Sequence, residues 1–299
     1  MSESDGESTD PGEVFAAVAN EMRFSILRAV WDLTKASDDR AASFARIREA
    51  AGVRDSGQFN YHLQELMPRF VARVGEEGYV VTYAGARLVG AVVSGVYTDD
   101  GTSVEPRPVG ECPNCGGTVE AGYETEQMRI ECVDCEVTVT DMPAPPVVAA
   151  GHDPEDLPSV YSQYLYTETE RVNRGFCPSC SGRIDTTVRE PDASEGFEAH
   201  LDVVHECREC GARSHSALGA KVLDHPAVIA LYYDAGIDVR ETPIWELTEL
   251  FETAGEIVGE DPIRVETTVE VDGEALDLLL DENLDVIEHE RRTAPGDSG

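Results

Sequence analysis

The feature that most constrains how this chain folds is a set of eight cysteines arranged in four Cys-x-x-Cys pairs. The pairs are Cys112 with Cys115, Cys132 with Cys135, Cys177 with Cys180, and Cys207 with Cys210. Sixteen residues separate the first two pairs, and 26 separate the last two. Two such pairs supply the four thiolates of a tetrahedral zinc site. The sequence therefore predicts two structural Zn²⁺ ions per chain, with all eight cysteines as ligands.

Two other roles for the cysteines are open, redox switching and zinc sensing. Catalysis by zinc is disfavoured, because a catalytic zinc keeps a position for water and four thiolates leave none. The histidines of the second half are scattered without the pattern of a general base. We therefore do not expect an enzyme.

The charge balance of the chain is strongly acidic. Asp and Glu number 59, Lys and Arg number 23, and the formal net charge is −36. Only Lys35 and Lys221 are lysines. In concentrated salt the Debye length falls to a few ångströms, so that repulsion among carboxylates is screened. This composition resembles that of proteins from halophilic archaea.

Two properties predict a cytoplasmic protein that does not enter a membrane. No apolar run approaches the roughly 20 residues of a membrane span. The first residues, MSESDGESTDPG, are acidic and polar, unlike a signal peptide. In a reducing compartment, metal thiolates are favoured over disulfides.

Residues 20–74 depart from the acidic balance of the chain. This stretch contains nine basic and seven acidic residues. A nearly neutral island in such an acidic chain indicates a surface that meets a negatively charged partner.

The apolar pattern predicts a series of short elements. Helices are expected around 14–18, 22–33, 44–51 and 56–67, followed by a hairpin of 70–74 with 79–82 and a helix through 88–93. Residues 97–110 are expected to be a linker. Further helices are expected at 158–172, 227–233 and 245–251, and strands at 184–188, 197–204, 265–271, 276–280 and around Val286.

Residues 11–95 resemble the winged helix-turn-helix of the ArsR-like transcriptional regulators, in particular those of halophilic archaea. The resemblance is carried by VFAAVANEMRFSILRAV, SGQFNYHLQEL and GYVVTYAGARLVGA. It implies that the helix over 56–67 enters the major groove of double-stranded DNA, and that the last helix of this domain pairs two copies into a homodimer. Some ArsR-like repressors carry a cysteine motif in the preceding helix, but Ser43–Ala51 contains no cysteine. Arsenic or cadmium sensing is therefore not expected.

The helix over 56–67 directs its apolar stripe to the core, which leaves its polar positions for DNA. Gln58 and Asn60 can pair bidentately with adenine. Arg54 and Ser56 are candidates for phosphate contacts near the start of the helix, and Arg73 is a candidate from the wing. The predicted DNA-binding residues are Arg54, Ser56, Gly57, Gln58, Asn60, Tyr61, Gln64 and Arg73.

The two cysteine segments resemble zinc ribbons, so the predicted fold is an α+β multidomain chain. It comprises a disordered acidic N-terminus (1–10), a winged helix-turn-helix domain (11–96), a first zinc ribbon with linkers (97–150), a helix with a second zinc ribbon (151–215), a mixed α/β segment (216–291) and a disordered tail (292–299).

These features predict a sequence-specific DNA-binding transcriptional regulator with structural zinc. The alternative is a general transcription-machinery factor associated with RNA polymerase. A winged helix followed by a zinc ribbon also resembles the archaeal relatives of the general factor that opens promoters. A thiol redox sensor or zinc sensor is the less favoured reading.

Overall fold

The computed structural model describes residues 10–35, 41–76, 78–99, 101–153, 155–190, 201–251 and 253–294. The chain divides into two units, with the boundary between residues 100 and 101. The predicted disordered end at 1–10 lies outside the described residues except for Asp10. That residue caps α1, because its side chain accepts the N–H of Gly12 at 2.8 Å.

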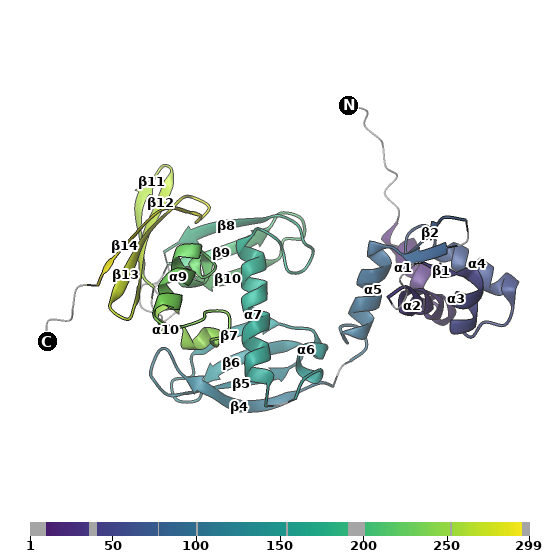
Figure 1. Cartoon of the computed structure of the whole chain (residues 1–299), viewed down its shortest axis with the longest axis horizontal. Coiled ribbons are helices and arrows are strands. Elements are labelled where there is room, and N and C mark those ends of the chain that lie inside the picture. The colour runs from purple at the N-terminus through teal and green to yellow at the C-terminus, as the bar shows by residue number, and fades with distance from the viewer. Residues whose placement is uncertain are drawn as a thin grey trace. The chain divides into compact units, whose positions relative to one another are not determined.

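The N-terminal unit alternates short helices with a small sheet (Figure 1). Its elements are α1 (Pro11–Val18), α2 (Glu21–Lys35), β1 (Ala42–Ser43), α3 (Phe44–Ala50), α4 (Ser56–Leu66), β2 (Val71–Val74), β3 (Gly78–Val81) and α5 (Tyr83–Val93). The strands are antiparallel in the order β1-β3-β2. The helices and the hairpin predicted between residues 14 and 93 are confirmed to within a few residues.

Local sequence fixes where two of these helices begin. The Asp55 carboxylate accepts the N–H of Gln58 at 2.6 Å and starts α4. The Thr82 hydroxyl accepts the N–H of Gly85 at 3.1 Å and starts α5. Gly85 has to be glycine, since a Cβ there would overlap the carbonyl oxygen of Phe70. The helices then bury one apolar core, whose fully buried members are Ile26, Leu27, Val30, Ile47, Phe59, Leu63, Leu66, Val71 and Val89.

The C-terminal unit contains three antiparallel sheets and six helical segments among its described residues (Figure 1). The strands are β4 (Val104–Glu111), β5 (Thr118–Glu124), β6 (Gln127–Cys132), β7 (Thr138–Pro143), β8 (Ile184–Arg189), β9 (Asp202–Cys207), β10 (Arg213–Ala217), β11 (Gly255–Glu260), β12 (Ile263–Val271), β13 (Glu274–Leu280) and β14 (Val286–Thr293). The helical segments are α6 (Pro146–Ala150), α7 (Leu157–Asn173), α8 (Leu218–Val222), α9 (Pro226–Asp234), the 3-10 turn η1 (Ile244–Glu246) and α10 (Thr248–Phe251). The sheet orders are β4-β5-β6-β7, β10-β9-β8 and β11-β12-β13-β14.

A single hydrophobic cluster joins these three sheets, so the segments predicted as 97–150, 151–215 and 216–291 lie in one unit. Helix α7 runs from beside the first sheet to the second (Figure 1). Trp245 is fully buried, and its indole N–H donates to the carbonyl of Val109 at 3.3 Å. The Ser162 hydroxyl on α7 accepts the N–H of Ile244 at 2.9 Å. The boundaries of the three segments as separate modules stay predictions.

Three predicted elements differ in part from the structure. Residues 97–110 were expected as a linker because of their prolines, but 104–111 form β4. Prolines fit there because β4 is an edge strand with shifts of register around Pro106 and Pro108. The single helix expected at 245–251 is divided into η1 and α10. The tail was expected to begin at residue 292, but Arg292 and Thr293 pair with Ala275 and Glu274 in the sheet, and residues 295–299 lie outside the described residues.

The other predictions for this unit are confirmed for α7, β8, α9, β12, β13 and β14. Part of the strand expected at 197–204 lies outside the described residues, and β9 begins at Asp202. None of the helices in the described ranges is both long enough and apolar enough to cross a membrane.

Candidate metal centres and exposed helix face

Each Cys-x-x-Cys pair forms a tight knuckle with the same backbone hydrogen bonds. The N–H of the first cysteine donates to the carbonyl five residues on, as from Cys132 to Val137 at 2.9 Å. The carbonyl of the first cysteine accepts the N–H four residues on, as from Glu136 to Cys132 at 3.1 Å. The first cysteine of each pair is buried and the second is exposed. The four knuckles therefore present their sulfurs in the same manner.

The knuckles bring the eight cysteines together in the two predicted groups. In both groups the ligand atoms all lie within 4.8 Å of one another. Cysteines of different knuckles come close to each other, with Sγ–Sγ distances of 3.8 Å for Cys112–Cys135 and 3.6 Å for Cys115–Cys132. In the second group the distances are 3.8 Å for Cys177–Cys210 and 3.4 Å for Cys180–Cys207.

These distances fit a shared metal ion. All eight thiols are free, since a disulfide would bring two sulfurs to about 2.05 Å. Four Zn–S bonds of about 2.3 Å in a regular tetrahedron separate the sulfurs by about 3.8 Å. Both groups could thus hold one metal ion each, and together they account for every cysteine of the chain.

Hydrogen bonds from N–H groups stabilise the thiolate form of several ligands. The Asn114 side-chain amide donates to Cys135 Sγ at 3.5 Å and lowers the pKa of that thiol to about 6. The backbone N–H of Cys210 lowers the pKa of Cys207 to about 7. The sequence analysis did not identify Asn114 as a residue of the metal centre, although it lies between the two cysteines of Cys-Pro-Asn-Cys.

The residue after each second cysteine has a left-handed backbone. Gly116 and Gly211 have φ of 70° and 73°, and Glu136 and Ser181 have φ of 59° and 63°. A residue with a Cβ is disfavoured in this conformation by about 1–2 kcal/mol. The two knuckles without glycine therefore fold at a cost that the other two avoid.

We expect Glu136→Gly and Ser181→Gly each to stabilise the C-terminal unit by about 1 kcal/mol. The measurement is the denaturant midpoint of the metal-loaded protein, followed by the fluorescence of buried Trp245. Gly116→Ala and Gly211→Ala are the matched controls, and they should lower the midpoint. An unchanged midpoint in both glycine variants would show that backbone strain does not limit these knuckles.

Helix α4 separates apolar from polar residues sharply. Phe59, Leu63 and Leu66 are fully buried, and Phe44 of α3 packs edge-on against Phe59 at a ring-centroid distance of 4.6 Å. The predicted DNA-contact residues on this helix are all exposed. They are Ser56, Gly57, Gln58, Asn60, Tyr61 and Gln64.

The other predicted contact residues flank this face in the sequence. Arg54 is exposed just before α4. Arg73 is exposed on β2, and its guanidinium donates to the carbonyl of Glu76 in the hairpin turn. The start of α4 carries a carboxylate, because Asp55 is the cap, and this negative charge lies where phosphate contacts were expected from Arg54 and Ser56.

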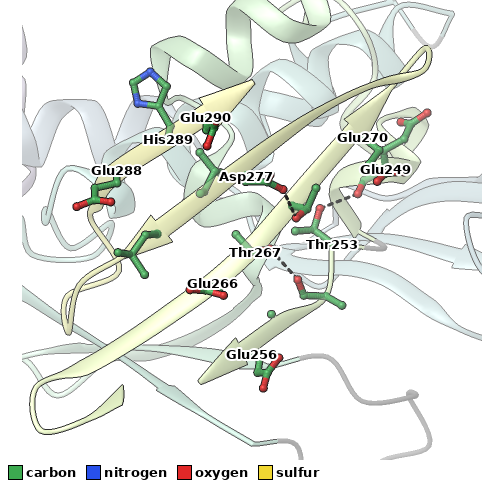
Figure 2. Close-up of a pocket in the computed structure, with 15 residues that line it drawn as sticks. Glu249, Thr253, Glu256, Glu266, Thr267, Glu270, Asp277, Glu288, His289 and Glu290 are labelled. Atoms are coloured by element: carbon green, nitrogen blue, oxygen red, sulfur yellow. Dashed lines mark hydrogen bonds between the residues drawn. The ribbon is translucent and has the colours of Figure 1, made fainter. Parts of the chain in front are cut away.

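The sheet β11–β14 carries an acidic outer face that the sequence analysis did not identify. Figure 2 shows the carboxylates of this face. They line a hollow with a volume of about 1200 Å³. The strand register places Glu256 opposite Glu266, and Asp277 opposite Glu290. Among the described residues, only the two cysteine groups bring three or more candidate ligand atoms close enough together to hold a metal ion. The carboxylates of the acidic face do not form such a group. Like charges opposite each other destabilise a sheet at low salt, and salt screens them.

Comparison with known proteins identifies families without an assigned role. Residues 109–286, more than half of the chain, match the family described as a domain of unknown function, DUF7351. The chain therefore belongs to the DUF7351 family. Residues 11–92 match a second domain of unknown function, DUF7347. Searches of curated proteins and of solved structures gave no match.

Proposed function

We propose that this protein is a sequence-specific DNA-binding transcriptional regulator. In this proposal the N-terminal unit is a winged helix-turn-helix, α3 and α4 are its paired helices, and β2 with β3 form the wing. The cysteine groups hold one structural Zn²⁺ each. The element order supports the proposal, since two short helices joined by a five-residue turn precede the hairpin.

The observation that carries the proposal is the two-sided character of α4. One side is fixed in the core by Phe59, Leu63 and Leu66, and the other side is polar and exposed. A helix held in this way can enter a major groove without losing its packing. Gln58 and Asn60 then supply amides for adenine, and Arg54, Ser56 and Arg73 supply phosphate contacts.

The acidic composition sets the conditions in which such binding has to work. Counterion release provides much of the affinity of DNA-binding proteins at low salt, and this contribution fades as salt rises. A chain with a net charge of −36 therefore has to rely on base contacts and apolar fit. A cytoplasm rich in salt, as in halophilic archaea, is the setting that we propose for it.

The test is DNA binding by the full-length protein in molar potassium chloride. Binding sites selected from a random DNA library should share a motif. Asn60→Ala should weaken binding to that motif about tenfold or more and relax the preference for adenine at one position, because a bidentate contact discriminates by about 1–3 kcal/mol. Gln163→Ala, an exposed amide on α7, is the control and should bind as the wild type does.

A second variant should act in the opposite direction. Asp55→Asn keeps the helix cap but removes a negative charge beside the expected phosphates, so affinity should rise for all sequences alike. An unchanged motif in Asn60→Ala, together with unchanged affinity in Asp55→Asn, would refute the placement of α4 in the groove.

We also propose that the N-terminal unit forms a homodimer. Large apolar side chains on and next to α1 and α5 are exposed, with Phe15 at 67%, Tyr83 at 76% and Tyr97 at 70%. A second copy would cover them. A titration of the selected DNA site with the full-length protein tests this, because a dimer binds as two chains per DNA site.

Association with RNA polymerase is the second candidate function. It is favoured by the order of the chain, in which two cysteine centres follow the helical unit. A genome-wide occupancy map separates the two candidates, because a regulator occupies a few operators and a general factor occupies most promoters.

A further inference from the structure

The two cysteine centres have similar backbones but different side-chain support. In the first centre, Asn114 donates to Cys135, and the Asp134 carboxylate accepts the N–H of Thr118 at 3.0 Å, which ties one knuckle to the other. Ser179 and Glu209 occupy the equivalent places in the second centre. Among the described residues, neither side chain makes the corresponding hydrogen bond.

This difference leaves one exposed sulfur without a donor. Three of the four exposed cysteines accept an N–H: Cys115 from Gly117 at 3.4 Å, Cys135 from Asn114 at 3.5 Å, and Cys180 from Gly182 at 3.3 Å. Within the described ranges, no N–H meets the geometry of a hydrogen bond to the fourth, Cys210. Hydrogen bonds draw electron density from a thiolate and reduce its nucleophilicity.

We propose that Cys210 is a site of oxidation by peroxides, and that its oxidation opens the second centre while the first stays closed. The proposal rests on the metal-thiolate centres of the proposed function. A bound metal ion would hold Cys210 as a thiolate, exposure admits the oxidant, and the lack of a donor leaves its sulfur electron-rich. Cys177 lies 3.8 Å away and is the resolving thiolate.

The chemistry balances with hydrogen peroxide as the oxidant. The Cys210 thiolate attacks one peroxide oxygen, the O–O bond breaks, and hydroxide leaves, which gives a sulfenic acid. The Cys177 thiolate then attacks the Cys210 sulfur, forms the S–S bond and displaces a second hydroxide. Two thiolates lose two electrons, and the peroxide gains them. A metal ion held by this centre would then have only Cys180 and Cys207 as thiolate ligands, and it would be released.

The experiment uses the full-length, metal-loaded protein in molar potassium chloride. Metal content before treatment tests the proposed centres themselves, since well under two zinc ions per chain would refute them. Hydrogen peroxide is then added, a chromogenic chelator follows metal release, and peptide mass mapping locates disulfides. We expect one metal equivalent to leave about tenfold faster than the other, with a Cys177–Cys210 disulfide. Release of both at one rate, or an earlier Cys112–Cys135 disulfide, would overturn the proposal.

Two reciprocal variants test the physical cause. Ser179→Asn supplies the missing donor and should slow release from the second centre toward the rate of the first. Asn114→Ser removes the donor from the first centre and should speed its release toward the rate of the second. Both positions are exposed, and untreated metal content confirms that each variant is loaded. A loaded Ser179→Asn protein that loses its metal as fast as the wild type would reject the role of the donor.

Discussion

Removal of metal from both cysteine centres is expected to unfold the C-terminal unit and leave the N-terminal unit folded. Three knuckles lie in the connections from β4 to β5, from β6 to β7 and from β9 to β10, and the fourth precedes β8, so a bridging ion would fix the ends of both sheets. Binding of a structural zinc contributes about 10–16 kcal/mol, whereas a whole domain is stable by about 5–15 kcal/mol. The N-terminal unit has no cysteine and buries its own apolar core.

The two tryptophans of the chain report on the two units separately. Trp31 lies on α2, and Trp245 lies fully buried in the C-terminal unit. In a Trp31→Phe variant, a strong chelator at molar salt should shift the Trp245 emission to that of an exposed indole. The far-ultraviolet helix signal of α1 to α5 should remain. Readdition of Zn²⁺ should restore the emission, and Mg²⁺, which prefers oxygen ligands, is the control.

Two outcomes would contradict this expectation. A chelated protein that keeps the Trp245 emission would mean that the shared hydrophobic cluster holds the unit without metal. Loss of the helix signal of both units together would mean that the N-terminal unit does not fold by itself.

The parts of the structure that could be predicted are those that local sequence determines. Cys-x-x-Cys spacing defines a knuckle within a few residues, so both ligand groups follow from the sequence. The period of Phe59, Leu63 and Leu66 likewise defines which side of α4 is buried. Each knuckle and the buried side of α4 depend on contacts within one turn or one helix, whereas the pairing of the knuckles joins cysteines 23 and 27 positions apart.

The parts that could not be predicted depend on contacts between distant residues. Residues 104–110 of the expected linker form a strand because β5 pairs with them, and nothing within the segment reveals that partner. Trp245 and Val109 are 136 positions apart in the sequence. The packing of the three segments into one core therefore cannot be predicted from local sequence. The acidic face of Figure 2 arises in the same way, because β11 brings Glu256 opposite Glu266.

Close packing of two helices in that shared core sets a second large effect. Gly219 of α8 is buried against α10, and a Cβ on it would overlap the carbonyl oxygen of Leu250 and lie 2.5 Å from its carbonyl carbon. We expect Gly219→Ala to destabilise the C-terminal unit by about 3 kcal/mol, the upper part of the range for overpacking. The measurement is the denaturant midpoint of the metal-loaded protein, read from Trp245.

The control separates the clash from the general effect of replacing a glycine in a helix. Gly90 of α5 has no atom within 4 Å of the place of a Cβ, so Gly90→Ala should stabilise the N-terminal unit by up to about 1 kcal/mol. Both substitutions make the same chemical change in a helix, and only the neighbouring backbone differs. Leu250 is itself 3% exposed and followed closely by β11, so α10 has little room to withdraw. If Gly219→Ala unfolds at the wild-type midpoint, α8 and α10 can move apart at no cost. In that case the contact between them does not fix the position of sheet β11–β14 relative to sheet β8–β10.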